Sequence, residues 1–132
     1  VQSCFLNRRD VTDFIANPEI GYVTFVGSTA SGRAMYQSVA ERRFIDIGLE
    51  LGGKDCAYIA EDADPIAAAD GVIDGSLYNA GQSCCAIERV YVHEKVYEKF
   101  MQRAEEIVKS HVIGDPMHEA TTMGPLTLPD TP

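Results

Sequence analysis

Residues 22–51 constrain the fold more than any other part of the sequence. They hold, in order, an apolar β-branched run, a glycine-serine turn, a helical stretch and an alternating run, at residues 22–26, 27–28, 29–40 and 44–51. A strand, a helix and a second strand in this order favour a parallel pairing, because the helix supplies the crossover. The sequence therefore predicts an α/β fold in which this unit is half of a doubly wound sheet motif.

The chain on either side continues the alternation of helices and strands. Upstream, Asp10 is a plausible N-cap for a short helix over 11–16. Downstream, Gly52-Gly53 is a natural hinge, after which a different lobe can begin. Beyond the hinge the sequence predicts a strand, a helix opened by Asp64-Pro65, a second strand and an amphipathic helix, at residues 56–60, 64–79, 89–92 and 94–109.

The charge balance argues against two classes of partner. The formal net charge is -9, and the basic residues form only short pairs such as Arg42-Arg43, which are typical of solvated element ends. Nucleic acids and anionic membranes require clustered Lys and Arg to neutralise phosphates. We therefore expect neither nucleic acid nor an anionic membrane as a partner.

The cysteines and the chain ends bear on the compartment. Four cysteines without a paired C-x-x-C spacing predict neither a disulfide framework nor a metal site. A cytoplasmic protein is the default expectation, although a targeting segment ahead of Val1 would change it. The absence of an initiator methionine and the loop-like last residues predict a segment of a longer protein.

The turn at Gly27-Ser28 has two interpretations. Backbone N–H groups and the helix dipole at a strand-to-helix turn form an anion site. A simple helix N-cap made by Ser28 or Thr29 explains the same residues without a ligand. Nucleotide triphosphates are disfavoured, because Arg33-Ala34 follows the last glycine where a phosphate loop needs Lys and then Ser or Thr.

Glu50 is a candidate general base. It lies between two leucines at the end of an apolar strand, where burial would penalise the charged carboxylate and favour proton acceptance. The alternative is a surface glutamate on an edge strand, and periodicity alone favours that alternative.

Cys84 and Cys85 are the candidate nucleophiles. Both follow a glycine turn and have small neighbours that leave room for a substrate. The alternative is a pair of buried, inert thiols. Adjacent side chains point in different directions, so at most one of the two faces a given pocket. Spacing does not choose between them.

Three motifs in order resemble the aldehyde dehydrogenase superfamily. They are a strand-and-turn motif, a strand-and-hinge motif and a Gly-Gln-x-Cys motif, at residues 25–29, 49–54 and 79–84. Later segments at 89–92, 113–116 and 123–126 also resemble family landmarks, so the similarity covers nearly the whole chain. Three motifs at matching intervals are far more specific than any one.

The resemblance implies a fold and a set of roles. It implies the end of a doubly wound, Rossmann-like dinucleotide-binding lobe over 1–51, joined to the start of an α/β catalytic lobe over 52–132. Cys84 is implied as the nucleophile and Glu50 as the general base. The remaining implied site residues bind NAD or NADP, at the pyrophosphate or near the nicotinamide: Gly27, Ser28, Leu51 and Gly52.

The resemblance also implies an activity. A thiolate adds to an aldehyde, the thiohemiacetal gives up hydride to the dinucleotide, and the thioester is hydrolysed to a carboxylic acid. Transfer of the acyl group to coenzyme A is a related outcome, and Glu50 favours hydrolysis. The full-length enzyme is expected to be a homo-oligomer, and the isolated segment to be inactive. The alternative is a non-catalytic aldehyde dehydrogenase-like binding or structural protein.

Overall fold

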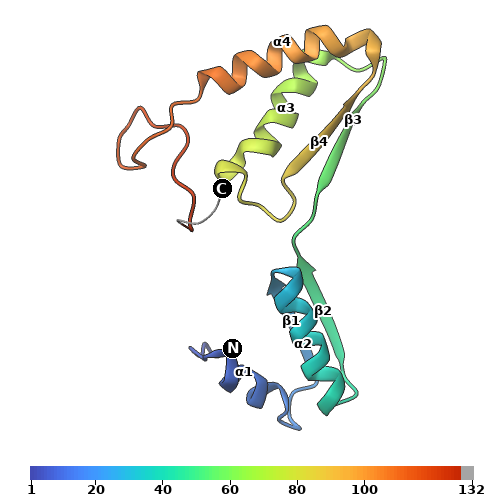
Figure 1. Ribbon diagram of the computed structural model, residues 1–132, viewed down its shortest axis with the longest axis vertical. Helices are drawn as coiled ribbons and strands as arrows, with labels where there is room; N and C mark the ends of the chain where they lie inside the picture. The colour runs from blue at the N-terminus through green and yellow to red at the C-terminus, as the bar shows by residue number, and fades with distance from the viewer. Residues whose placement is uncertain (129–132) are drawn as a thin grey trace. The chain divides into compact units, whose positions relative to one another are not determined.

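The computed structural model describes residues 1–128 and has a mixed α/β fold with parallel strands, as the sequence predicts (Figure 1). The chain forms two compact units that divide between Gly52 and Gly53. Each unit contains a two-stranded parallel sheet with helices packed against it.

The first unit contains the predicted strand–helix–strand motif. Its elements are α1 (Arg8–Ile15), β1 (Tyr22–Gly27), α2 (Thr29–Arg42) and β2 (Asp46–Leu51). The strands pair in parallel from Tyr22 opposite Asp46 to Gly27 opposite Leu51, which confirms the predicted pairing. A small core of Ile15, Val23 and Val39 joins α1, β1 and α2.

Two sequence-based boundaries in this unit are wrong. Asn7 caps α1 instead of Asp10, because the Asn7 side chain accepts a hydrogen bond from the backbone N–H of Asp10 at 3.0 Å. The second strand begins at Asp46 instead of 44, and the side chain of Phe44 is fully exposed. Asp10 has a side chain that suits a cap but lies after the true cap. Phe44 has a side chain that suits a strand but lies before the true start of the strand.

The second unit has the order strand, helix, strand and helix, with a short 3₁₀ helix after its first α-helix. Its elements are β3 (Asp55–Ile59), α3 (Pro65–Leu77), the 3₁₀ helix η1 (Tyr78–Gly81), β4 (Ile87–Val92) and α4 (Glu94–Ser110). Strand β3 pairs with β4 in parallel. The predicted cap is confirmed, since Asp64 accepts hydrogen bonds from the N–H groups of Ile66 at 2.9 Å and Ala67 at 3.3 Å.

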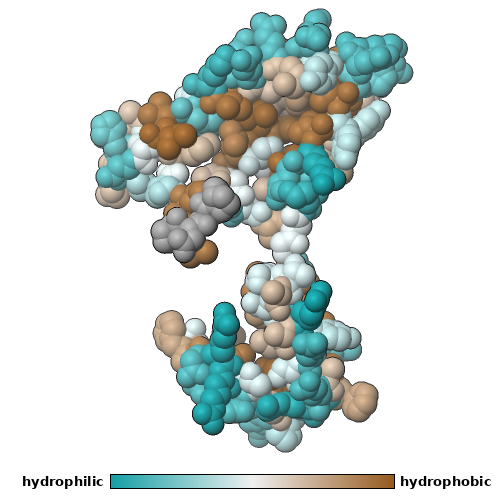
Figure 2. All heavy atoms as spheres, in the orientation of Figure 1, coloured by the Kyte–Doolittle hydropathy of each residue, from teal (hydrophilic) through white to brown (hydrophobic). Residues whose placement is uncertain are grey.

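The amphipathic helix α4 closes the core of the second unit. Its buried residues Val96, Phe100 and Ala104 pack with residues of α3 and β3. Figure 2 shows the hydrophilic outer side of this helix above apolar atoms that face α3. The amphipathic character predicted for this helix is therefore confirmed.

Among residues 1–128, no helix has the length and apolar character that crossing a membrane requires.

Candidate functional site

The turn between β1 and α2 is a capped helix start. Ser28 Oγ accepts a hydrogen bond from the Ser31 N–H at 3.2 Å, which confirms the capping interpretation for Ser28. Capping uses one donor of the first turn, and the first N–H groups of a helix have no acceptor within the helix. The turn is exposed, so the N–H groups of Thr29 and Ala30 fit an anionic group at the helix start.

The end of β2 lies beside this turn. Gly27 is opposite Leu51 in the parallel register, and the Leu51 side chain packs over the buried Gly32 of α2. Three of the expected dinucleotide residues, Gly27, Ser28 and Leu51, thus share the carboxyl edge of one parallel sheet, and Gly52 follows directly. This edge is where open α/β sheets bind their ligands.

Glu50 is exposed in the first unit. It lies opposite Val26 in the register, next to Leu51 on a strand that has only one sheet neighbour. Successive side chains of a strand point to opposite faces, so Glu50 points away from the α2 side that Leu51 covers. The carboxylate of Glu50 is thus exposed at the edge of this unit and not buried as the argument for a general base expected.

Cys84 and Cys85 lie on an exposed turn between η1 and β4. The Ala86 N–H donates to the Ser83 carbonyl at 3.2 Å and closes the turn. Both thiols are exposed, so the alternative of buried, inert cysteines is wrong. Their surroundings differ, because Cys85 Sγ lies 3.3 Å from Ser83 Oγ.

Gly53 lies close to the backbone of the same turn. A Cβ built on Gly53 would lie 3.2 Å from the carbonyl oxygen of Cys84, so a larger residue would press on the turn. Next to this contact, Lys54 forms an ion pair with Glu88 of β4. The start of the second unit thus lies close to the cysteine turn and is paired with β4 just after it.

Sequence reasoning missed a role for Gln82. The Gln82 side chain is partly buried and forms hydrogen bonds to two other segments, at Asn79 and at Thr127. Its place in the Gly-Gln-x-Cys motif was the available signal, but the motif does not say which atoms a glutamine would contact.

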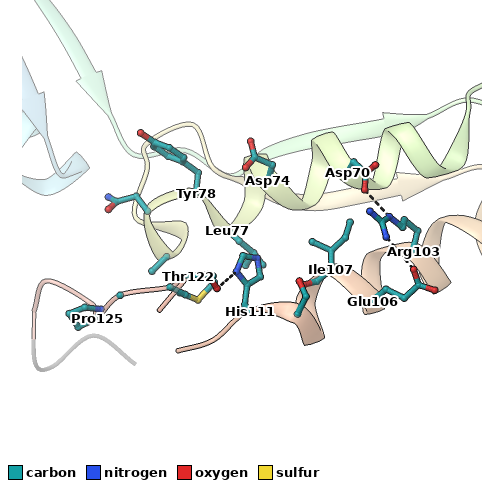
Figure 3. A pocket seen from close by; sticks show the side chains of 15 residues that line it. Asp70, Asp74, Leu77, Tyr78, Arg103, Glu106, Ile107, His111, Thr122 and Pro125 are labelled. Atoms are coloured by element: carbon teal, nitrogen blue, oxygen red, sulfur yellow. Dashed lines mark hydrogen bonds and ion pairs between the residues drawn. The ribbon is translucent and has the colours of Figure 1, made fainter. Parts of the chain in front are cut away.

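A cavity near these residues lies between the C-terminal parts of α3 and α4 and the segment after α4 (Figure 3). Its volume is about 650 Å³, and Cys84 is not among the residues that line it. Arg103 crosses from α4 to Asp70 of α3 at 2.8 Å and also contacts Glu106 at 3.3 Å. Hydrogen bonds to Asp70 and Glu106 raise the pKa of Arg103 above its ordinary value.

Within residues 1–128, no group of three or more His, Cys, Asp or Glu side chains is arranged to hold a metal ion.

The comparison with protein families gives one match over nearly the whole chain. The model of the aldehyde dehydrogenase family matches residues 5–130. An aldehyde dehydrogenase of Davidiella tassiana is 41% identical over 107 residues, which are 81% of this chain and 22% of that protein. The chain therefore spans about a fifth of the length of the curated relatives it matches.

Solved structures agree with this match. An NADP-dependent enzyme of Escherichia coli has a TM-score of 0.80 and 32% sequence identity, and the match covers 87% of this chain and 24% of that one. A 1-pyrroline-5-carboxylate dehydrogenase from Thermus, solved with bound NAD, has a TM-score of 0.75 and 26% identity, covering 90% and 24%.

Proposed function

The chain belongs to the aldehyde dehydrogenase family, and we propose that the protein oxidises an aldehyde to a carboxylic acid with NAD or NADP as oxidant. The observation that carries the proposal is an exposed Cys84 on the tight turn of the Gly-Gln-x-Cys motif. An exposed thiol with small neighbours is open to a carbonyl substrate. The relatives' names indicate aldehydes as the substrate class.

Cys84 is the nucleophile of the proposed reaction. Its thiolate forms a bond from sulfur to the aldehyde carbon, and the carbonyl oxygen becomes an oxyanion. The backbone N–H of Cys84 is a candidate donor to that oxyanion. Loss of hydride from the same carbon leaves a thioester on Cys84.

Glu50 is the general base of the second half-reaction. The carboxylate takes a proton from water, the hydroxide adds to the thioester carbon, and the carbon–sulfur bond breaks. The products are the carboxylic acid and the regenerated thiol of Cys84. Support for this assignment comes from the position of Glu50 in the Leu-Glu-Leu-Gly-Gly segment that resembles the family motif.

The first unit is proposed as part of the NAD(P)-binding lobe and the second as part of the catalytic lobe. Gly27 and Ser28 would hold the pyrophosphate, because the exposed helix start beside them suits an anion. Leu51 and Gly52 would lie near the nicotinamide. When bound, the dinucleotide supplies the hydride acceptor.

Replacement of one cysteine at a time tests the proposal. In the intact protein, Cys84→Ala is expected to abolish NAD(P)-dependent aldehyde oxidation, because the proposed thioester forms on the sulfur of Cys84. Cys85→Ala is the matched control and is expected to retain turnover. Oxidation that survives in Cys84→Ala, or is lost only in Cys85→Ala, would overturn the assignment.

A further inference from the structure

Gln82 joins three segments of the second unit through its side chain. Its Oε1 accepts a hydrogen bond from the backbone N–H of Thr127 at 2.7 Å. Its Nε2 donates to the carbonyl of Asn79 at 3.0 Å, with a longer contact to the carbonyl of Pro125 at 3.5 Å. A carboxamide offers both an acceptor and donors, so one side chain serves both sides of this junction.

Asn79 returns the interaction from the other side. Its Nδ2 donates to the Gln82 carbonyl at 3.2 Å, and the Gln82 N–H donates to the Asn79 carbonyl at 3.1 Å. Together with the side-chain bond of Gln82, three hydrogen bonds close the short loop between these two residues.

This loop has an unfavourable backbone. Asn79 and Ala80 have φ angles of 53° and 56°, in the left-handed region that residues with a Cβ rarely adopt, and Gly81 follows at 77°. A left-handed residue with a Cβ costs free energy and persists only where other interactions hold it. The hydrogen bonds of Gln82 provide such interactions.

We infer that Gln82 is a positioning residue for Cys84, which rests on the proposed role of Cys84 as nucleophile. Cys84 lies two residues after Gln82, and its own side chain is exposed, whereas Ala86 at the far end of the turn is buried. The backbone on the N-terminal side of Cys84 is therefore held by the Gln82 carboxamide, which attaches it to residues 125–127. Release of this attachment lets the thiol leave the geometry that the carbonyl addition requires.

Two substitutions separate the acceptor from the donors. Gln82→Glu keeps an oxygen for the Thr127 N–H and loses both donated hydrogen bonds. Gln82→Met keeps the length of the side chain and loses all of them. The exposed Gln102 of α4 gives a matched control, Gln102→Met, in the same unit.

Kinetics and amide exchange in the intact protein test the inference. Gln82→Met is expected to lower kcat on the order of 10- to 100-fold with an unchanged KM for the dinucleotide, and Gln82→Glu to fall between it and the wild type. Amide exchange at Thr127 is expected to accelerate in Gln82→Met and to stay slow in Gln82→Glu. Gln102→Met is expected to match the wild type in both measurements.

Each outcome decides the question. If Gln82→Met keeps wild-type kcat while Cys84→Ala is inactive, the inference is wrong and the proposed function stands. If Cys84→Ala keeps turnover, the function and the inference fall together. If Gln82→Met does not fold, Gln82→Glu decides, because a lowered kcat at unchanged melting temperature and unchanged KM supports a positioning role and an unchanged kcat overturns it.

Discussion

Leu51 fills the space in which a side chain on Gly32 would stand. A Cβ built on Gly32 would lie 2.5 Å from Leu51 Cδ2 and 3.2 Å from Cδ1. Gly32 is buried in α2, and Leu51 is the last residue of β2. The helix start and the strand end, which carry the proposed dinucleotide residues, therefore approach each other only because residue 32 has no side chain.

Gly32→Ala is expected to displace Leu51 and to lower the free energy of unfolding by about 1 kcal/mol, because overpacking outweighs the better helix propensity of alanine. Gly32→Ala is also expected to weaken binding of the dinucleotide, and a calorimetric titration measures the dissociation constant. Gly71→Ala is the control, since a Cβ on this exposed glycine of α3 would have open space around it. That substitution is expected to stabilise by roughly 0.5–1 kcal/mol. Equal stabilisation by both would contradict the prediction.

Local sequence patterns made the helices and strands predictable. The apolar run of β1, the Asp64-Pro65 start of α3 and the amphipathic pattern of α4 each follow a local rule, and the structure confirms all three. Phe44 shows the limit, because it directly precedes the alternating residues 45–47 and resembles part of the strand, although the backbone pairing starts at Asp46. Pairing depends on the partner strand, which a local pattern does not contain.

The site was less predictable than the fold. The motifs indicated Cys84 and Glu50, but the exposure of both side chains depends on packing that the sequence does not state. The role of Gln82 depends on Thr127, which lies 45 residues away along the chain. Contacts at that separation follow from the tertiary arrangement and leave no periodic signal.

The hydrogen bonds of Arg43 are a further interaction that the sequence alone does not reveal. Its guanidinium donates to the carbonyl of Ile20 at 2.6 Å, to that of Pro18 at 3.1 Å, and to that of Asn17. The sequence interpretation of Arg42-Arg43 as solvated ends is wrong for Arg43, which is in an extended conformation directly after α2 and turns its side chain to the 17–20 segment.

Arg43→Lys is expected to destabilise the first unit by about 1–2 kcal/mol, because an ammonium group cannot serve three diverging carbonyls as a guanidinium does. Amide exchange at Ile20, whose N–H donates to the Asn17 carbonyl at 3.0 Å, measures the loosened segment. Arg42→Lys is the neighbouring control, since Arg42 forms only an exposed pair with Asp13 at 3.6 Å, and it is expected to change little. Equal effects of the two substitutions would rule out the explanation.

Ala80 is expected to be improved by replacement with glycine. Its φ of 56° is left-handed, and a Cβ in that region costs about 1 kcal/mol. Ala80→Gly is therefore expected to stabilise the second unit by about 0.5 kcal/mol after the greater flexibility of glycine in the unfolded chain is subtracted. Ala67→Gly, at an exposed position of α3, is expected to destabilise by roughly 0.5–1 kcal/mol. Denaturant unfolding gives both values, and the same sign for both would refute the argument.

Glu50→Gln separates the two half-reactions of the proposed mechanism. The amide has a similar shape but cannot accept a proton from water, so the thioester on Cys84 is expected to form and then persist. A rapid-mixing experiment is expected to show an undiminished initial burst of reduced dinucleotide, followed by a steady-state rate lowered on the order of 10²- to 10⁴-fold. Glu41→Gln, on the exposed end of α2, is the control and is expected to keep both phases. Loss of the burst itself would place Glu50 in the first half-reaction, and an unchanged steady state would show that another group activates the water.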